Sequence, residues 1–279
     1  MKTPEQLKGA IRKIAKEKQL KPQEVLQMFL FERILERLSL SKYQDNFILK
    51  GGLLISSMIG VEGRSTLDMD TTVRGIPMEE EAIREIILEL LQMDVGDGIQ
   101  FTFQKMEPIR ENDAYNNFRV HIKAAYGKID APMKMDITTG DRITPAAITY
   151  FYRLLFEDKS VPVMAYSIET ILAEKYETII RRNIGNTRAR DFYDLYVLFK
   201  SRYDEIQLPI FKLAVENTAR KRGSLAEMGE WQEICEEIKD EPALERLWIN
   251  YQNENHYATA ISFTDVVDNL IEVGNCLNN

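Results

Sequence analysis

The stretch LKGGLLISSMIGVEGRSTLDMDTTV, residues 49–73, decides the fold. A short apolar run, 47–49, predicts a buried strand, and the sequence Lys50-Gly51-Gly52 interrupts it. The apolar segment 53–59 then predicts a helix, and the alternating polarity of 66–73 predicts a second strand. Glycines at a strand-to-helix junction let backbone N–H groups approach a phosphate at the positive end of the helix dipole. The stretch therefore predicts a phosphate site, although a tight turn that needs glycine would give the same pattern.

Two carboxylates stand two residues apart on the second predicted strand. Side chains alternate between the faces of a strand, so we expect Asp68 and Asp70 to share one face. Adjacent carboxylates repel unless a cation lies between them, and Mg²⁺ prefers a few carboxylates together with substrate phosphates. The chain has 44 acidic residues, so such triplets also arise by chance on solvated strand faces.

A third carboxylate lies further along, in the segment KMDITTGD, residues 134–141. Alternation puts Lys134, Asp136 and Thr138 on one face of a strand. Three carboxylates on neighbouring strands beside a glycine turn are typical of a two-metal phosphoryl-transfer site. The sequence therefore predicts that Asp136 joins Asp68 and Asp70 as a ligand of Mg²⁺.

Composition narrows the class of protein. At 279 residues and 44% apolar content, the chain should form two packed domains with a substantial core. The start lacks a secretory signal and no apolar run is long enough for a membrane span, so we expect a cytoplasmic protein without membrane contact, and a monomer. Two cysteines and two histidines exclude a disulfide framework, a zinc cluster and a conventional Ser-His-Asp triad. The net charge of −8 counts against a broad grip on nucleic acid.

The rest of the chain divides into two parts. Helices are predicted at 5–18, 23–38 and 78–93, and β-like runs at 99–106, 117–126, 129–138 and within 148–167. From Ser167 onward the periodicity is helical, with helices at 168–182 and 189–201, a turn at 183–186 and further helices in 208–279. We therefore predict an α+β fold with an αβ domain at 1–162, which includes the N-terminal helices, and a helical domain at 163–279.

Five segments together resemble one family. They are residues 49–73, KMDITTGDRITP, LLFED, ETILAEKYETII and NTRARDFYDLYVL, and they occur in the same order from about Asn46 to Phe199. The combination resembles the AbiEii toxins, nucleotidyltransferase-like proteins of bacterial abortive-infection and toxin–antitoxin systems. The resemblance implies a polymerase-β-type nucleotidyltransferase domain with a mixed sheet, followed by a mainly helical domain. It also implies Mg²⁺ dependence, binding of an NTP (GTP or another), and a cognate antitoxin encoded alongside.

The resemblance assigns roles to residues of both domains. The first acidic motif of the family falls on Asp68 and Asp70, and its final aspartate falls on Asp191. Its downstream lysine falls on Lys175, which would neutralise triphosphate charge in the absence of a P-loop. Without the resemblance, Lys175 and Asp191 would be interpreted as ordinary helix-surface charges. Asp194, one turn beyond Asp191, is the alternative to it.

The nucleotide-binding residues implied near the glycine pair are Lys50, Gly51, Gly52, Ser57 and Arg64. The general superfamily pattern has Ser or Thr directly after the glycines, whereas this chain has leucine there. Ser57 instead precedes the first acidic residue at a spacing used within the family. Arg64 is assigned by its position alone.

The leading functional prediction is Mg²⁺-dependent transfer of a nucleotide from an NTP to a cellular acceptor, such as the 3′ end of tRNA or another RNA. One alternative is nucleotidylation of a protein or small molecule, which the acidic net charge favours slightly. Another is a non-catalytic NTP-binding regulator. Four arginines could contact an RNA acceptor or pair with surface carboxylates; they are Arg181, Arg182, Arg188 and Arg190.

Overall fold

The computed structural model describes residues 3–109 and 116–278, and the chain divides into two compact units. The first unit comprises Met1–Asp141 and Ile148–Ala165, and the second comprises Arg142–Ala147 and Tyr166–Asn279. The boundary between residues 162 and 163 that the sequence suggests falls inside β7 (Ser160–Ala165).

The short segment 142–147 belongs to the second unit because of its hydrogen bonds. The hydroxyl groups of Ser167 and Thr170 both donate to the carbonyl oxygen of Thr144, at 2.9 and 3.0 Å. The backbone N–H of Thr144 donates to the hydroxyl oxygen of Thr170 at 2.9 Å. These bonds attach the segment to the first turn of α5 (Ile168–Arg182).

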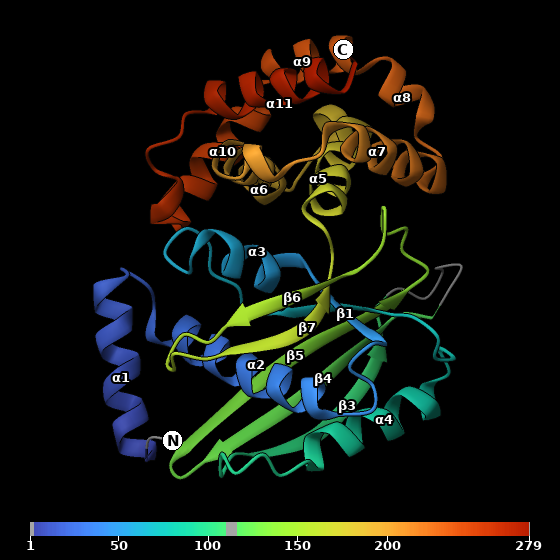
Figure 1. The fold of residues 1–279 in the computed structure, drawn as a ribbon. Coiled ribbons are helices and arrows are strands. Elements are labelled where there is room, and N and C mark those ends of the chain that lie inside the picture. Colours follow the sequence, from blue (N-terminus) through green and yellow to red (C-terminus); the bar gives the residue numbers. More distant parts are fainter. Residues whose placement is uncertain (1–2, 110–115, 279) are drawn as a thin grey trace. The chain divides into compact units, whose positions relative to one another are not determined.

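A seven-stranded sheet forms the centre of the first unit over the described residues (Figure 1). Its strands run in the order β3-β4-β5-β2-β1-β7-β6. Their bounds are β1 Phe47–Lys50, β2 Met69–Val73, β3 Gln100–Pro108, β4 Phe118–Tyr126, β5 Ile129–Thr139, β6 Ile148–Arg153 and β7 Ser160–Ala165. The β2–β5 and β1–β7 pairs are parallel and the other four are antiparallel, so the sheet is mixed, as predicted.

One predicted strand starts later than its polarity pattern suggests. The alternation of 66–73 predicted a strand over the whole segment, but β2 begins at Met69. The reason is the lack of ladder partners further back: the pairing with β5 starts at Met69, and the pairing with β1 ends at Asp70. The hydroxyl of Thr66 instead donates to the carbonyl oxygen of Asp68 at 3.2 Å, within a local turn.

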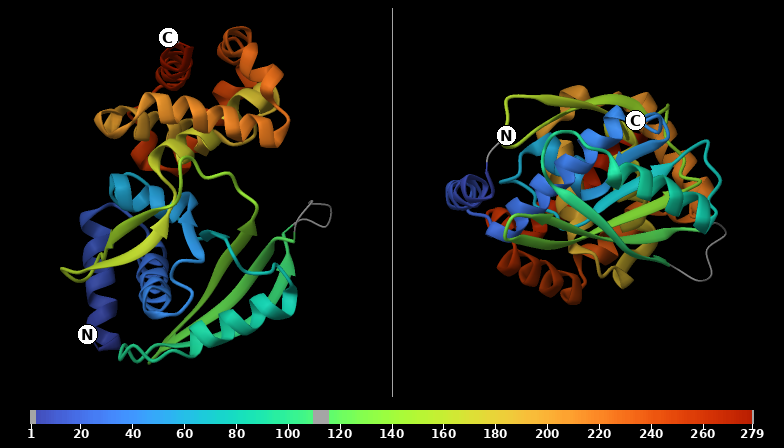
Figure 2. Two further views of the ribbon diagram at one scale, coloured as in Figure 1. Left: turned by 45° about the vertical axis from the view of Figure 1, so that its right-hand side comes forward. Right: turned by 90° about the horizontal axis from the view of Figure 1, so that it is seen from below.

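The helices of the first unit are α1 (Pro4–Glu17), α2 (Pro22–Leu40), α3 (Gly51–Ile59) and α4 (Glu80–Gln92). In Figures 1 and 2, α2 and α4 lie along one face of the sheet. The strands alternate accordingly, since Val120, Ile122, Met133 and Met135 are buried at 2% exposure or less. The opposite face of β4 and β5 carries the polar residues, which places charged side chains on an accessible sheet surface.

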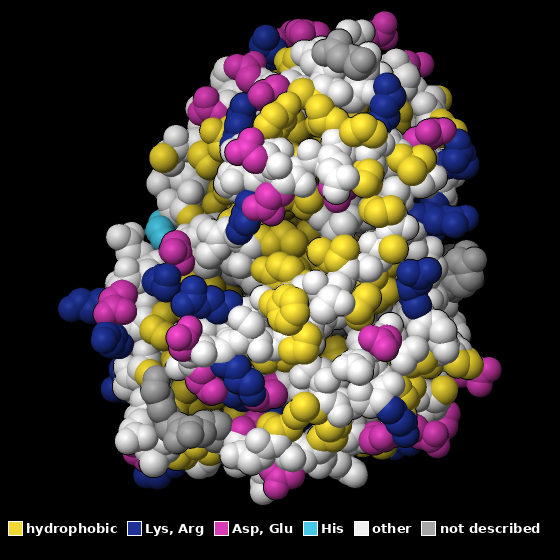
Figure 3. Space-filling view, in the orientation of Figure 1, with side chains coloured by type: hydrophobic (Ala, Val, Ile, Leu, Met, Phe, Trp, Pro, Cys, Tyr) yellow, Lys and Arg dark blue, Asp and Glu magenta, His cyan; other side chains and the backbone are white. Residues whose placement is uncertain are grey.

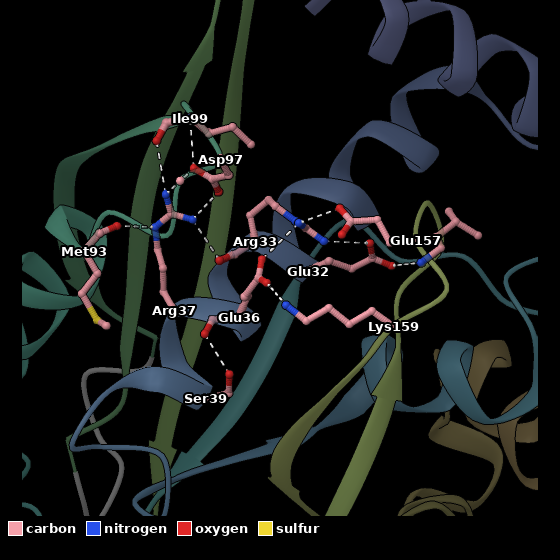
Figure 4. A network of polar contacts seen from close by, with 12 residues as sticks. Glu32, Arg33, Glu36, Arg37, Ser39, Met93, Asp97, Ile99, Glu157 and Lys159 are labelled. Atoms are coloured by element: carbon pink, nitrogen blue, oxygen red, sulfur yellow. Dashed lines mark hydrogen bonds and ion pairs between the residues drawn. The ribbon is translucent and has the colours of Figure 1, made fainter. Parts of the chain in front are cut away.

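Helix α2 is buried along nearly its whole length and carries an internal network of charges (Figure 4). Arg37 donates to both carboxylate oxygens of Asp97, at 2.6 and 2.8 Å, and to the carbonyl oxygen of Met93. One turn earlier, Arg33 contacts Glu36 and Glu157, both at 3.1 Å. Buried charges are tolerated when they are paired and hydrogen-bonded in this way.

The second unit is helical within the described residues. Beside α5 it contains α6 (Ala189–Ser201), α7 (Leu208–Arg222), α8 (Leu225–Gly229), α9 (Trp231–Lys239), α10 (Pro242–Glu254) and α11 (Phe263–Asn278), with short 3₁₀ turns at Asn183–Gly185, Tyr203–Glu205 and His256–Ala258. Helix α5 ends where Asn183 adopts a positive φ of 47°. This is the turn that the sequence predicted between the first two helices of the unit.

None of the helices in the described part of the chain has the length and apolar character needed to cross a membrane. On the face of the molecule shown in Figure 3, acidic and basic side chains are interspersed. A phosphate-binding site in this acidic protein is therefore expected to be local and to depend on particular side chains.

Candidate active site

A row of four charged side chains crosses four neighbouring strands of the sheet. Lys50 of β1 is in register with Asp70 of β2, and Asp70 is in register with Asp136 of β5. Arg119 of β4 is in turn opposite Asp136. Residues in register on adjacent strands project to the same side, so the four side chains share one face and the strands that carry them are about 4.8 Å apart. The two carboxylates in the middle are thus neighbours, with a cation at each end.

Arg119 is the member of the row that the sequence did not single out. Its Nε and Nη2 donate to the two carboxylate oxygens of Asp136, both at 2.8 Å. This bidentate hydrogen bonding raises the pKa of Arg119 further above its usual value, and the nearby charge of Asp68 adds to the effect. The only sequence signal was the position of Arg119 on the polar face of an alternating strand, and its partner depends on the register of β4 against β5.

The glycine pair lies directly against this row. Gly51 has φ +66°, and a Cβ atom at this position would lie 2.1 Å from Oδ2 of Asp70. A side chain would therefore displace the Asp70 carboxylate as well as strain the backbone. Gly51 and Gly52 form the first turn of α3, which begins two residues earlier than the predicted segment 53–59. The first turn of α3, whose N–H groups have no partner within the helix, lies beside the carboxylate of Asp70.

Asp68 precedes β2, so its position does not follow from strand alternation as predicted. It nevertheless lies on the side of the sheet that carries the row, because its charge acts on Arg119 and it lines a pocket together with His121 and Lys134 of that face. Asp68 and Asp70 are both half-buried. Solvent can therefore reach this pair of carboxylates.

Arg64 and Thr66 pack against the second glycine. A Cβ atom on Gly52 would lie 2.7 Å from the hydroxyl oxygen of Thr66 and 3.2 Å from Nη2 of Arg64. Arg64 is only 2% exposed, and its guanidinium donates to the carbonyl oxygen of Ser65. The structure thus places the predicted Arg64 at the start of α3, in a buried position. It also adds Thr66, a hydroxyl at the glycine turn that the sequence analysis missed.

Two of the predicted nucleotide-binding residues have partners of their own. The ammonium of Lys50 contacts Asp141 at 2.6 Å and donates to the hydroxyl of Thr138 at 2.7 Å. The hydroxyl of Ser57 lies 2.9 Å from that of Tyr150 and donates to a backbone carbonyl in its own helix. Ser57 is six residues beyond the start of α3, about 9 Å along the helix axis. The structure therefore does not bring Ser57 to the glycine turn.

The donor atoms of this site fit a hard divalent cation. Asp68 and Asp70 supply carboxylate oxygens, the ligand type that Mg²⁺ prefers, and Asp136 lies beside Asp70 with both of its oxygens engaged by Arg119. Over residues 3–109 and 116–278, no group of three or more Asp, Glu, His or Cys side chains converges to hold a metal ion unaided. The residues therefore suit a cation that shares its coordination with substrate phosphates.

The second unit contains a separate, buried charge cluster, hereafter the lysine cluster, of Lys175, Asp191 and Asp194. The Lys175 ammonium lies 2.7 Å from Oδ1 of Asp191 and 2.8 Å from Oδ2 of Asp194. Burial by itself lowers the pKa of Lys175, but the two carboxylates outweigh it and the net pKa is raised. Arg188 reaches Oδ2 of Asp191 at 2.6 Å. Asp191 thus contacts both Lys175 and Arg188. Asp194, the alternative to Asp191 in the sequence analysis, also contacts Lys175.

Residues 33–269 match a known protein family, described as "Nucleotidyl transferase AbiEii toxin, Type IV TA system". The chain belongs to the AbiEii family. Among solved structures, a proposed nucleotidyltransferase from H. pylori is similar with a TM-score of 0.51 at 15% identity, over 93% of this chain and 98% of that one. JHP933 from Helicobacter pylori is similar with a TM-score of 0.50 at 16% identity, over 93% of this chain and 92% of that one. No curated protein matches the sequence.

These matches confirm the predicted family and fold class. This AbiEii protein has the nucleotidyltransferase-type αβ unit with a mixed sheet, followed by helices, and it belongs to a family of toxins from type IV toxin–antitoxin systems. At these low identities the solved structures establish the fold alone. The functional roles of individual residues are therefore argued from their geometry.

The four arginines of this AbiEii protein have different surroundings. Arg181 contacts the fully buried Glu177 at 2.7 Å, and Arg188 contacts Asp191, so these two pair with carboxylates. Arg188 and Arg190 line a pocket of about 510 Å³ together with Tyr251 of α10. Arg190 is exposed, and it has no ion-pair partner in the part of the chain that the structure describes. Arg188 and Arg190 therefore lie beside a space that a ligand could enter.

Proposed function

We propose that this chain is a Mg²⁺-dependent nucleotidyltransferase that moves a nucleotide from an NTP to an RNA acceptor. The observation that carries the proposal is the charged row on the open sheet face, with Asp70 against Gly51 and Asp68 beside it. Membership of the AbiEii family supports the reaction class and implies a cognate antitoxin.

In the reaction, an acceptor hydroxyl oxygen forms a bond to the α-phosphorus, and the bond from that phosphorus to the β-bridging oxygen breaks. Pyrophosphate leaves, and the hydroxyl proton passes to a carboxylate or to water. Asp68 and Asp70 would hold the cation, with Asp136 as a third ligand once Arg119 releases it. The bound cation would supply charge neutralisation at the α-phosphate and orientation of the attacking hydroxyl.

Other residues of the first unit would bind the substrate. The first-turn N–H groups of α3 suit the triphosphate, because glycine lets the backbone come close to it. Lys50 and Arg119 stand at the two ends of the carboxylate pair, where either cation can balance phosphate charge. Lys175 is engaged with two buried aspartates, and we propose that it contributes to the nucleotide site as the family resemblance implies.

The test is transfer of label from α-labelled NTPs, with Mg²⁺, to total RNA or to cellular protein in parallel reactions. Label in RNA is the expected result. Label in protein alone would replace the proposal by protein nucleotidylation, and nucleotide binding without transfer would replace it by a regulatory role. Omitting each NTP in turn would identify the nucleotide that is used.

A further inference from the structure

A group of three polar side chains connects one end of the charged row to the end of β5. The ammonium of Lys50 contacts Oδ2 of Asp141 at 2.6 Å and donates to the hydroxyl oxygen of Thr138 at 2.7 Å. That hydroxyl lies 3.0 Å from the same carboxylate oxygen, so each of the three side chains contacts the other two. All three residues belong to the first unit. The side chains of Lys50 and Asp141 are only 15% and 17% exposed, so their contact is partly shielded from solvent.

These contacts draw the Lys50 side chain across the sheet. Lys50 ends β1, Thr138 lies on β5, and β2 runs between these two strands. Lys50 is in register with Asp70 and projects to the face that carries the charged row. Thr138 lies two residues beyond Asp136 on β5 and projects to the same face. The side chain of Lys50 therefore passes over β2, the strand that carries Asp70.

The position of Asp141 depends on a turn that follows β5. The strand ends at Thr139, and Gly140 adopts φ +76°, a conformation that a residue without a Cβ atom takes readily. After this turn the carboxylate of Asp141 meets the hydroxyl of Thr138, three residues earlier in the chain. Asp141 thus reaches Lys50 from a turn, although the two residues are far apart in the sequence.

Holding a lysine in one place affects how it can bind an anion. A lysine side chain is long and flexible, and fixing it costs conformational entropy. Contacts within the folded protein offset that cost before a substrate arrives, so the ammonium is already placed for an anionic ligand. Without Asp141, the in-register Asp70 would compete for the ammonium. The lysine would then be drawn to a carboxylate that the proposed function assigns to the cation.

We propose that Asp141 is a positioning residue, which holds the Lys50 ammonium over β2 so that it meets the phosphates of the substrate. The ligand class is a polyphosphate, because lysine recognises phosphate through its compact positive charge. In this role Asp141 acts through Lys50 and contacts neither the phosphates nor the cation. The inference rests on the proposed function, since it assigns the residue that orients one of the substrate-binding groups.

Charge alone makes the opposite prediction for Asp141. Its carboxylate is an anion near a site for anions, so Coulomb repulsion by itself would make phosphate binding tighter when the carboxylate is removed. Positioning predicts weaker binding instead, and only while Lys50 is present. The direction of the change and its dependence on Lys50 therefore distinguish the two effects.

The experiment is a double-mutant cycle in which isothermal titration measures the affinity for inorganic tripolyphosphate with Mg²⁺. Asp141→Ala should weaken binding about tenfold in the wild-type background, but less than about twofold when Lys50→Met is already present. Asp141→Asn keeps an oxygen that can accept from the ammonium, so it should lose less affinity than Asp141→Ala. The control Asp158→Ala removes the same charge from a side chain of the first unit that is 98% exposed, and should change the affinity less than about twofold.

The outcomes separate this inference from the proposed function. Equal losses in both backgrounds, or tighter binding by Asp141→Ala, would overturn the positioning role, while nucleotide transfer by the wild-type protein would still stand. Loss of Mn²⁺ binding in Asp141→Ala, measured without polyphosphate, would also overturn it, because Asp141 would then be a ligand of the cation. If binding shows the predicted dependence on Lys50 but the wild-type protein transfers no label, the positioning role is supported and the proposed reaction fails.

Discussion

The charged row on the sheet and the lysine cluster of the helical unit both pair cations with carboxylates, but the carboxylates of the cluster are more deeply buried. In the row, the side chains of Arg119 and Asp136 are 36% and 13% exposed. In the cluster, the side chains of Lys175, Asp191 and Asp194 are 14%, 1% and 0% exposed. Ligands and solvent can reach the row, whereas the cluster satisfies its own charges inside the unit. We therefore expect changes in the row to affect binding and chemistry, and changes in the cluster to affect folding first.

The largest effect on stability is expected in the lysine cluster. Lys175→Ala removes the buried cation that Asp191 and Asp194 share, and breaking a buried ion pair in this way costs about 3–5 kcal/mol. The free energy of unfolding, measured by urea denaturation, should fall by that amount. An unfolding free energy unchanged from wild type would show that the cluster does not stabilise the helical unit.

A matched control separates folding from function at the same place. The triple variant Lys175→Met, Asp191→Asn, Asp194→Asn removes all three charges and should recover most of the lost stability. Its transfer activity then decides the role of the cluster. If this stable protein transfers nucleotides normally, Lys175 and Asp191 have only a structural role.

Gly51→Ala is the next largest change, at the contact between the glycine turn and the row. The positive φ costs about 1–2 kcal/mol for a residue with a Cβ atom, and the new atom would displace the Asp70 carboxylate. We expect a lower melting temperature together with loss of transfer activity. Gly9→Ala, in α1 with no atom within 4 Å of the new Cβ, should leave stability unchanged or slightly raised.

Glu32, in the first unit, tests whether burial determines how a charged side chain affects stability, whichever unit contains that side chain. This residue of α2 is 1% exposed, and burial raises its pKa to about 8 although the N–H of Leu155 donates to it at 2.7 Å. The raised pKa stabilises the folded protein below pH 4.5, and this stability is lost as pH rises to about 8. Glu32→Gln should therefore have a higher melting temperature than wild type at pH 9, by a few degrees, at about 2–4 °C per kcal/mol. The two proteins should melt alike at pH 4.5; a constant difference across this range would contradict the shifted pKa.

The smallest effect on stability is expected for Arg119→Ala, because partly exposed ion pairs contribute about 0–1 kcal/mol. Its effect on the cation site should be clearer. Removing the guanidinium leaves Asp136 unpaired beside Asp70, so the carboxylates should bind Mn²⁺ a few-fold more tightly in isothermal titration. Lys123→Ala, which removes an exposed pair on the same strand, is the control. Equal Mn²⁺ affinity in both variants would mean that Arg119 does not compete for Asp136.

Sequence patterns predicted most of the helices and strands, but only some of the contacts between their side chains. Periodicity located the helices and strands because each element buries one face, and alternation correctly assigned Asp136 to the polar face of β5. Alternation failed for Asp68, since a strand begins where ladder partners begin, and those depend on β1 and β5. Arg119 was missed for the same reason, because the register between two strands cannot be read from either one alone.

Residues on helices show the same limit of prediction from sequence alone. Lys175 and Asp191 would have been interpreted as surface charges on sequence alone, but the packing of α5 against α6 buries them together. Ser57 has the spacing of a phosphate-binding hydroxyl, yet its position on α3 directs it to Tyr150. In each case the local sequence pattern predicted the helix correctly. The side chain's contact partner depended on packing against residues far away in the sequence.

The most direct test of the account is Asp70→Asn, assayed for nucleotide transfer and for stability in the same preparation. The carboxylate is half-buried, in register with Asp136 and in contact with the glycine turn, so the substitution should remove the cation site without harming the fold. We predict that transfer falls at least a thousandfold and Mn²⁺ binding is lost, while the free energy of unfolding changes by less than about 1 kcal/mol. Transfer at the wild-type rate, with Mn²⁺ binding retained, would contradict the assignment of the row as the active site.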